Sequence, residues 1–153
     1  MEIRESEQRF LLLQQFLKEN ALGDFQVTPL ADDCSFRRYF RVKANEVSFV
    51  VMDAPPEKED TRPFIEISKL LNGYGFSAPR VFKVDSMNGF LILEDFGNET
   101  YTKALSEDKD ELCLYHLAID LLIDLGRRNY KEEITFLPKY DSRKFLEEVL
   151  LFL

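Results

Sequence analysis

Residues 25–52 contain three strand-like segments in close succession, and they limit the folds open to this chain. Residues 25–30 and 35–43 alternate apolar and polar side chains with a period of two, the pattern of a half-buried strand. Residues 47–52 are almost continuously apolar, which is typical of a central strand covered on both faces. Because the connections are too short for a parallel crossover, the sequence predicts an antiparallel sheet. Arg38 is the polar exception on the apolar side of its segment.

Two amphipathic helices are predicted beside this sheet. Residues 5–21 carry apolar side chains at helical spacing and stop before Gly23, a natural C-terminal cap. A second helix is predicted from Thr61, as its N-cap, with Pro63 in the first turn, and it ends at residues 72–75. These helices give the sheet apolar surfaces against which to pack.

Further strands are predicted at residues 80–84 and 90–93, joined by a turn that contains the hairpin dipeptide Asn88-Gly89. The strand pattern then stops. The spacing predicts one long helix over 107–128 and a last helix that runs from about Asp141 to Leu153. The last helix ends in its most apolar stretch, which favours an interface with another segment or with a second copy of the chain.

The order of these elements is that of a kinase small lobe: helix, three strands, helix, two strands, a linker and then helices. The predicted fold class is therefore α+β. It comprises a kinase-like small lobe with a five-stranded antiparallel sheet and a backing helix, an N-terminal helix, and the first helices of a large lobe. The predicted boundaries place the nucleotide-binding small lobe and linker at 1–97 and the truncated helical lobe at 98–153.

Composition excludes several other classes of protein. The chain has no apolar run of about 18 residues, which argues against a membrane partner. Its net charge of -8 argues against a nucleic-acid surface, although local arginines still suit a small phosphate. The N-terminus lacks the apolar region of a secretory signal, so Cys34 and Cys113 are predicted to be reduced thiols in a cytoplasmic protein.

Several motifs, taken in their order along the chain, indicate a family. They are SFRRYFRV at 35–42, VVMDAPP at 50–56, RPF at 62–64, LILEDFG at 91–97, TY at 100–101 and PKYD at 138–141. This ordered set resembles the bacterial N-acetylmuramate/N-acetylglucosamine anomeric kinases of the aminoglycoside-phosphotransferase-like superfamily. The resemblance implies phosphorylation of the anomeric hydroxyl of an amino sugar in cell-wall recycling, with ATP and magnesium as cofactors.

The kinase plan also indicates where the nucleotide binds. The turn between the first two strands covers the ATP phosphates, and the linker backbone bonds the adenine. The turn at 33–37 has no glycine, and the usual lysine position on the third strand is Met52, as in the kinases that this chain resembles. Arg37 or Arg38 is therefore expected to supply the positive charge. The predicted cofactor-binding residues are Ser35, Phe36, Arg37, Arg38, Met52, Glu94, Asp95 and Phe96.

No catalytic or metal-binding residue is predicted within the chain. The resemblance implies a catalytic Asp and a metal-binding Asp in segments expected after residue 153, so the isolated chain is expected to consume no ATP. Asp95-Phe96-Gly97 spells the magnesium-binding tripeptide of protein kinases, but no catalytic loop precedes it. His116 and Asp120 lie four residues apart on a predicted helix, which favours a partly buried polar pair over a catalytic loop.

Two alternatives stay open at this point. The acceptor of the phosphoryl group is expected to be an amino sugar, but an aminoglycoside, choline or homoserine fits the same superfamily. A different class of function is a non-catalytic nucleotide-sensing or dimerisation module, which self-associates through the apolar C-terminal helix.

Overall fold

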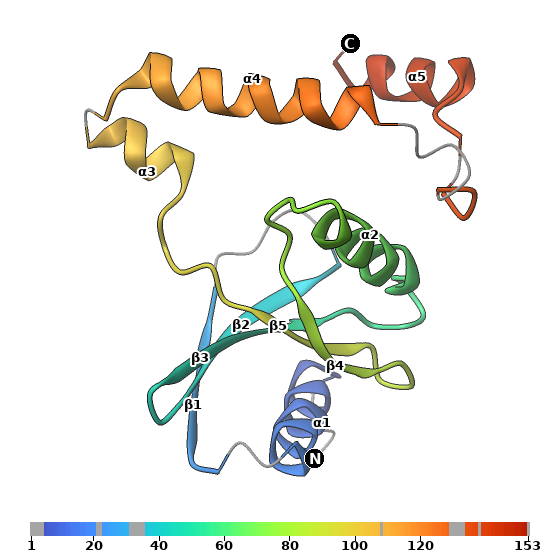
Figure 1. Ribbon diagram of the computed structural model, residues 1–153. Helices are drawn as coiled ribbons and strands as arrows, with labels where there is room; N and C mark the ends of the chain where they lie inside the picture. The colour runs from blue at the N-terminus through green and yellow to red at the C-terminus, as the bar shows by residue number, and fades with distance from the viewer. Residues whose placement is uncertain are drawn as a thin grey trace. The chain divides into compact units, whose positions relative to one another are not determined.

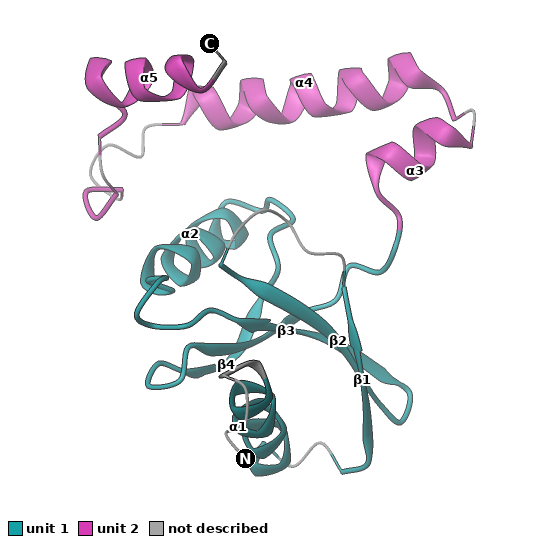
Figure 2. Ribbon diagram, turned by 180° about the vertical axis from the view of Figure 1, so that it is seen from behind, with its two compact units in different colours: residues 1–98 teal, residues 99–153 magenta. Residues whose placement is uncertain are grey.

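The computed structural model describes residues 5–20, 23–30, 36–107, 109–128, 134–137 and 139–152. The chain divides into two compact units, residues 1–98 and residues 99–153 (Figure 2). The first unit contains a sheet and two helices, and the second is helical.

The sheet has five antiparallel strands in the order β1-β2-β3-β5-β4 (Figure 1). The strands are β1 (Phe25–Pro29), β2 (Arg38–Ala44), β3 (Val47–Asp53), β4 (Val81–Asp85) and β5 (Phe90–Glu94). The predicted α+β fold class and five-stranded antiparallel sheet are confirmed. The apolar run of β3 is explained by its central place, because β2 and β5 pair with its two edges.

Two helices cover opposite faces of the sheet (Figure 1). Helix α1 (Glu5–Glu19) buries Leu13, Phe16 and Leu17 against side chains of β2, β3 and β5, and this side is called the α1 face. Helix α2 (Arg62–Gly73) packs Phe64 and Ile65 against the other side, called the α2 face. Successive residues of a strand point to opposite faces, so each strand contributes to both cores.

The predicted helix cap at Thr61 and the predicted turn at Asn88-Gly89 agree with the structure in position but not in every bond. Thr61 stands at the N-cap of α2 but makes no side-chain capping bond, and Asp60 Oδ1 instead accepts from the Arg62 N–H at 3.0 Å. The β4–β5 connection spans residues 86–89, with Gly89 at a φ of 71°. Asp85 Oδ1 accepts from the backbone of Met87 at 3.1 Å, so this side chain helps to shape the turn.

The second unit contains α3 (Tyr101–Ser106), α4 (Glu111–Arg127), α5 (Ser142–Val149) and the 3-10 helix η1 (Leu150–Phe152). The prediction of one helix from residue 107 was wrong at its start. Thr100 caps a separate α3, and Asp110 caps α4 by accepting from the Cys113 N–H at 3.1 Å. The last helix starts as predicted, because Asp141 accepts from the Lys144 N–H, but its regular part stops at Val149.

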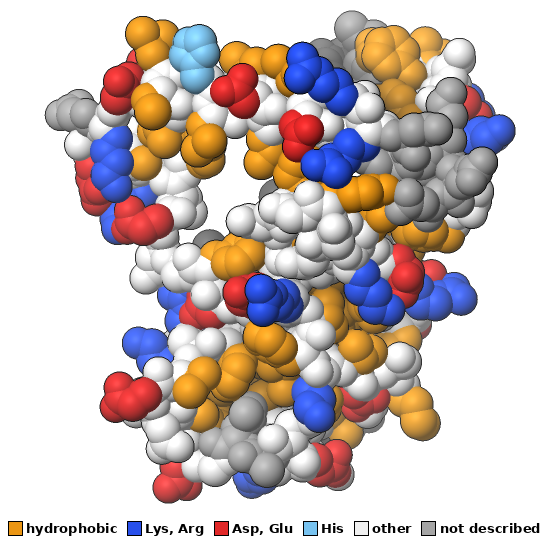
Figure 3. All heavy atoms as spheres, in the orientation of Figure 1, with side chains coloured by type: hydrophobic (Ala, Val, Ile, Leu, Met, Phe, Trp, Pro, Cys, Tyr) orange, Lys and Arg blue, Asp and Glu red, His pale blue; other side chains and the backbone are white. Residues whose placement is uncertain are grey.

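Apolar side chains lie at the surface of the helical unit (Figure 3). Leu112, Leu117 and Leu122 of α4 are each at least 60% exposed, and α4 has no buried residue. None of the described helices is long and apolar enough to cross a membrane. Cys113 is an exposed free thiol, and Cys34 lies outside the described residues.

Candidate functional site

The turn between β1 and β2 is the predicted phosphate-covering segment. Ser35 lies outside the described residues, and Phe36 and Arg37 follow it. Phe36 is 61% exposed, and the Lys58 ammonium lies 5.3 Å from the centre of its ring. Arg37 Nε donates to Glu59 Oε2 at 3.1 Å. This end of the sheet therefore presents an aromatic ring and paired charges.

The Arg37–Glu59 pair favours the charged form of an arginine that is cationic at neutral pH in any case. Burial alone would lower the pKa of Arg37, but the hydrogen bond to Glu59 and the charge of that carboxylate raise it above its usual value. Arg37 therefore stays fully cationic. A phosphate that reached this side chain would compete with Glu59 for its hydrogen bonds.

The structure places two predicted site residues on opposite faces of the sheet. Met52 is fully buried on the α2 face, opposite Tyr39 in the register of β2 and β3. Arg38 pairs in register with Asp53 and points to the α1 face. Met52 and Arg38 are thus separated by the sheet, although they lie on neighbouring strands.

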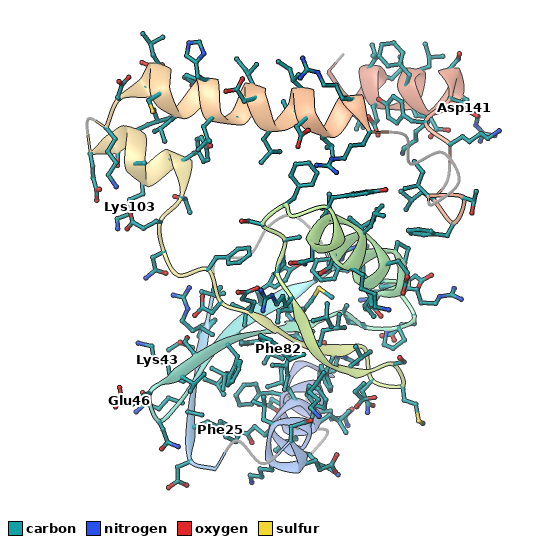
Figure 4. The ribbon with its side chains drawn as sticks, in the orientation of Figure 1. Phe25, Lys43, Glu46, Phe82, Lys103 and Asp141 are labelled. Carbon is teal, nitrogen blue, oxygen red and sulfur yellow. The ribbon has the colours of Figure 1, made fainter. Side chains whose placement is uncertain are left out.

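Arg38 belongs to a buried ion cluster that explains its exceptional place in the alternating pattern. Asp53 is 1% exposed, and its two carboxylate oxygens have separate partners. Arg9 Nε donates to Oδ1 at 2.9 Å, and Arg38 Nε donates to Oδ2 at 3.1 Å. Each arginine adds a second bond from Nη2. This Asp53 cluster joins α1 to the adjacent ends of β2 and β3. The register places the β2–β3 turn, where Figure 4 labels Glu46, at the opposite ends of these strands.

The β4–β5 turn packs closely on the residues that follow Asp53. The Ala54 N–H donates to the Gly89 carbonyl at 2.9 Å, and Arg9 Nη2 donates to the Asn88 carbonyl at 2.7 Å. A Cβ atom at Gly89 would lie 1.9 Å from the Ala54 oxygen. The approach of these two segments therefore requires glycine at this position.

The linker after β5 is held by a second buried ion cluster, on the α2 face. Arg41 donates to both carboxylate oxygens of Asp95, from Nε at 2.8 Å and from Nη2 at 2.9 Å. Ser48 Oγ donates to Asp95 Oδ2 at 2.5 Å. Asp95 Oδ1 also accepts from the Gly97 N–H, and Arg41 Nη2 donates to the Gly97 carbonyl, both at 2.9 Å. This Asp95 cluster fixes the linker to β2 and β3.

These bonds keep Asp95 ionised. Burial favours the neutral acid, but the hydrogen bonds from Arg41, Ser48 and the Gly97 N–H hold the pKa of Asp95 below its ordinary value. The carboxylate is therefore a fixed negative charge, and its oxygens are already occupied by donors.

Glu94 and Phe96 flank Asp95 and differ in their surroundings. Glu94 Oε2 accepts from the Arg80 N–H at 3.2 Å. Phe96 is 56% exposed, and its backbone N–H and C=O take part in no hydrogen bond between described residues. Both residues line a hollow of about 250 Å³ beside Arg80 and Ala78.

A larger hollow lies on the other side of the sheet. A groove of about 580 Å³ runs beside α1, and its lining is mostly apolar. Its lining residues are Glu7, Phe10, Leu11, Leu13, Arg38, Phe40 and Asp53. The groove thus borders the Asp53 cluster and not the linker.

Two motifs imitate a catalytic or metal site, the tripeptide Asp95-Phe96-Gly97 after β5 and the pair of His116 and Asp120 in α4. Among the described residues, no group of three or more His, Cys, Asp or Glu side chains is placed to hold a metal ion. His116 and Asp120 both lie within α4, and both are exposed and not partly buried as expected.

The sequence did not predict that four residues take part in the two clusters. They are Arg9 and Asp53 on the α1 face and Arg41 and Ser48 on the α2 face. The polar exception at Arg38 was a usable signal, because a charged residue on the apolar side of a strand needs a buried partner. Arg41 and Ser48 gave no such signal, since both occupy ordinary polar positions of their strands.

Comparison with known proteins gives the family. A model of the phosphotransferase enzyme family matches residues 26–127, which is more than half of the chain. The chain belongs to the phosphotransferase enzyme family. The matched range includes the sheet except Phe25, both ion clusters except Arg9, and α4.

Within this family, the chain is similar to several curated kinases. It is 41% identical to an N-acetylmuramate/N-acetylglucosamine kinase of Pseudomonas aeruginosa, over 83% of this chain and 36% of that protein. Identity to the kinase of the same name from Pseudomonas putida is 37%, over 92% of this chain and 41% of that protein. Identity to the kinase of the same name from Neisseria meningitidis is 35%, over 84% of this chain and 38% of that protein. The chain therefore spans about two fifths of the length of the relatives that it matches.

Proposed function

We propose that this chain forms the ATP-binding lobe, with its linker, of a kinase that phosphorylates the anomeric hydroxyl of N-acetylmuramic acid and N-acetylglucosamine. The observation that carries the proposal is the 41% identity to a kinase named for these two sugars. The kinase-like sheet and the family match support it. The cytoplasmic location and the absence of a nucleic-acid partner stay predictions.

The proposal assigns the phosphate end of ATP to the β1–β2 turn. Ser35, Phe36 and the backbone around them would cover the phosphates, and Arg37 would supply positive charge. Arg37 is favoured over Arg38 because Arg38 is bonded to Asp53 on the α1 face, whereas Met52 lies on the α2 face. Met52 would contribute an apolar wall in place of the usual lysine.

The proposal assigns the adenine to the linker. Phe96 offers a backbone N–H and C=O without partners among the described residues, and a purine edge needs such a donor and acceptor. Glu94 and Asp95 would hold the flanking backbone. Magnesium would neutralise charge between the phosphates, and its ligands and the catalytic Asp are assigned to other parts of the full-length protein.

The test is a kinase assay on the full-length gene product. Incubation with ATP, magnesium and either amino sugar is expected to yield ADP and the sugar 1-phosphate, identified by phosphorus NMR. Matched reactions contain an aminoglycoside, choline or homoserine as acceptor. Faster turnover of any of these three acceptors, or no turnover of either amino sugar, would contradict the proposed substrate.

A further inference from the structure

We infer that Arg41 is a positioning residue for the nucleotide, because it holds the linker in the conformation that leaves the Phe96 backbone available. This inference rests on the proposed function and deepens it. Arg41 does not itself need to touch the nucleotide. It acts through the side chain of Asp95 and the backbone of Gly97.

The contacts of Arg41 lie on both sides of Phe96. Before it, the guanidinium makes a two-point bond to the Asp95 carboxylate. After it, Arg41 donates to the Gly97 carbonyl at 2.9 Å and to the side chain of Asn98. Arg41 thus binds Asp95, Gly97 and Asn98 of the linker. Phe96, which lies between Asp95 and Gly97, makes no backbone hydrogen bond to any described residue.

The rest of the cluster closes the arrangement. Ser48 and the Gly97 N–H donate to the same carboxylate, so Asp95 receives bonds from β2, from β3 and from its own linker. Arg41 is 14% exposed and Asp95 is 6% exposed, so water competes little for these bonds. Since Gly97 has a φ of 78°, the linker turns sharply at the point where Arg41 holds its carbonyl.

The geometry requires arginine and not merely a positive charge. A planar guanidinium donates two parallel bonds to a carboxylate and further bonds in other directions, whereas a lysine ammonium acts as a point charge. A lysine at this position would keep the charge of the cluster but lose the two-point bond. The linker backbone would then sample other orientations, and nucleotide binding would include the cost of fixing it.

The experiment compares Arg41→Lys with Arg9→Lys in the full-length protein. Arg9 donates from Nε and Nη2 to one carboxylate oxygen of Asp53 on the opposite face and is 13% exposed, so it matches Arg41 in burial and in having a carboxylate partner. Arg41→Lys is expected to raise the KM for ATP about tenfold and to leave kcat and the KM for the sugar nearly unchanged. Arg9→Lys is expected to leave all three constants unchanged, although thermal unfolding will show lost stability in both variants.

An unchanged KM for ATP in Arg41→Lys would overturn the inference. An equal rise of the KM for ATP in Arg9→Lys would also overturn it, because the rise would then follow from lost stability. If Arg41→Lys does not fold, Ser48→Ala serves in its place, with a smaller rise in KM expected and an unchanged KM contradicting the inference. If the wild-type protein phosphorylates no amino sugar, the proposed substrate fails alone. Calorimetric titration with a non-hydrolysable ATP analogue then compares nucleotide affinity in the same variants.

Discussion

The sheet carries a buried aspartate cluster on each face, and the two clusters use the same chemistry for different ends. On the α1 face, Asp53 pairs with Arg9 and Arg38, and all three belong to or adjoin regular elements. On the α2 face, Asp95 pairs with Arg41 of β2 but itself lies in an irregular linker. The first cluster joins parts of the scaffold, and the second joins the scaffold to a segment of the proposed site.

The two clusters also differ in how their charges balance. Asp53 is one carboxylate shared by two guanidinium groups, and of these Arg9 also donates to the Asn88 carbonyl. Asp95 faces a single guanidinium, which has further acceptors at Gly97 and Asn98. Loss of the carboxylate should therefore leave more unpaired charge on the α1 face than on the α2 face.

The largest effect is expected for Asp53→Asn. This change removes a fully buried carboxylate and leaves the mostly buried Arg9 and the partly exposed Arg38 without a counter-charge. Breaking a buried ion pair costs about 3–5 kcal/mol. Asp95→Asn is expected to cost less, roughly 1–3 kcal/mol, because Arg41 keeps two other acceptors. Urea unfolding followed by circular dichroism measures both. Equal losses in the two variants would show that the difference in charge balance has no energetic consequence.

A smaller difference in stability is expected between alanine substitutions at the glycine beside each cluster. Gly89 and Gly97 both have positive φ angles, of 71° and 78°, but an added Cβ meets the Ala54 oxygen at 1.9 Å only in the first case. Gly97→Ala should cost about 1–2 kcal/mol, the usual penalty of a left-handed conformation. Gly89→Ala adds a backbone clash and should cost roughly 2–4 kcal/mol. A similar loss in thermal unfolding for both variants would contradict the close packing of Ala54 on the β4–β5 turn.

Periodicity and short connections were sufficient to predict antiparallel strands within residues 25–52, because connections of a few residues cannot make a parallel crossover. Periodicity was insufficient for helix starts, which depend on single capping groups. Asp110 accepts from a backbone N–H and starts α4 at Glu111, four residues after the predicted start, and Thr100 caps a short helix that was not predicted. Capping competes with propensity over a few residues, so periodicity alone misplaces such boundaries.

The candidate site was predictable only in part, for a related reason. Motif order located the linker and the β1–β2 turn, but it did not indicate which side chains meet across strands. Arg41 and Asp95 lie far apart in sequence, and only the register of β2, β3 and β5 brings them to one face. Likewise, the sequence left Arg37 and Arg38 as alternatives for the phosphates, and only the register of β2 and β3 shows that Arg38 pairs with Asp53 on the α1 face.

The smallest expected effect concerns the pH dependence of the Asp95 cluster. Hydrogen bonds from Arg41, Ser48 and Gly97 outweigh burial and lower the pKa of Asp95 from its ordinary 3.8. The stability that this shift contributes is complete above the unfolded pKa and is lost as the pH falls below 3.8 through the folded pKa. The free energy of unfolding should therefore fall less steeply with acid in Asp95→Asn than in the wild type.

The exposed pair of Asp60 and Arg62 gives the matched control for this measurement. Hydrogen bonds from Arg62 also lower the pKa of Asp60, whose side chain is 48% exposed. Salt screens exposed pairs far more than buried ones, so 0.5 M NaCl should reduce the acid dependence contributed by Asp60 and leave that of Asp95. Urea unfolding at a series of pH values, at low and high salt, compares Asp95→Asn with Asp60→Asn. If salt removed both contributions equally, the Asp95 cluster would be open to solvent, and a rigid linker held by Arg41 would no longer follow from its burial.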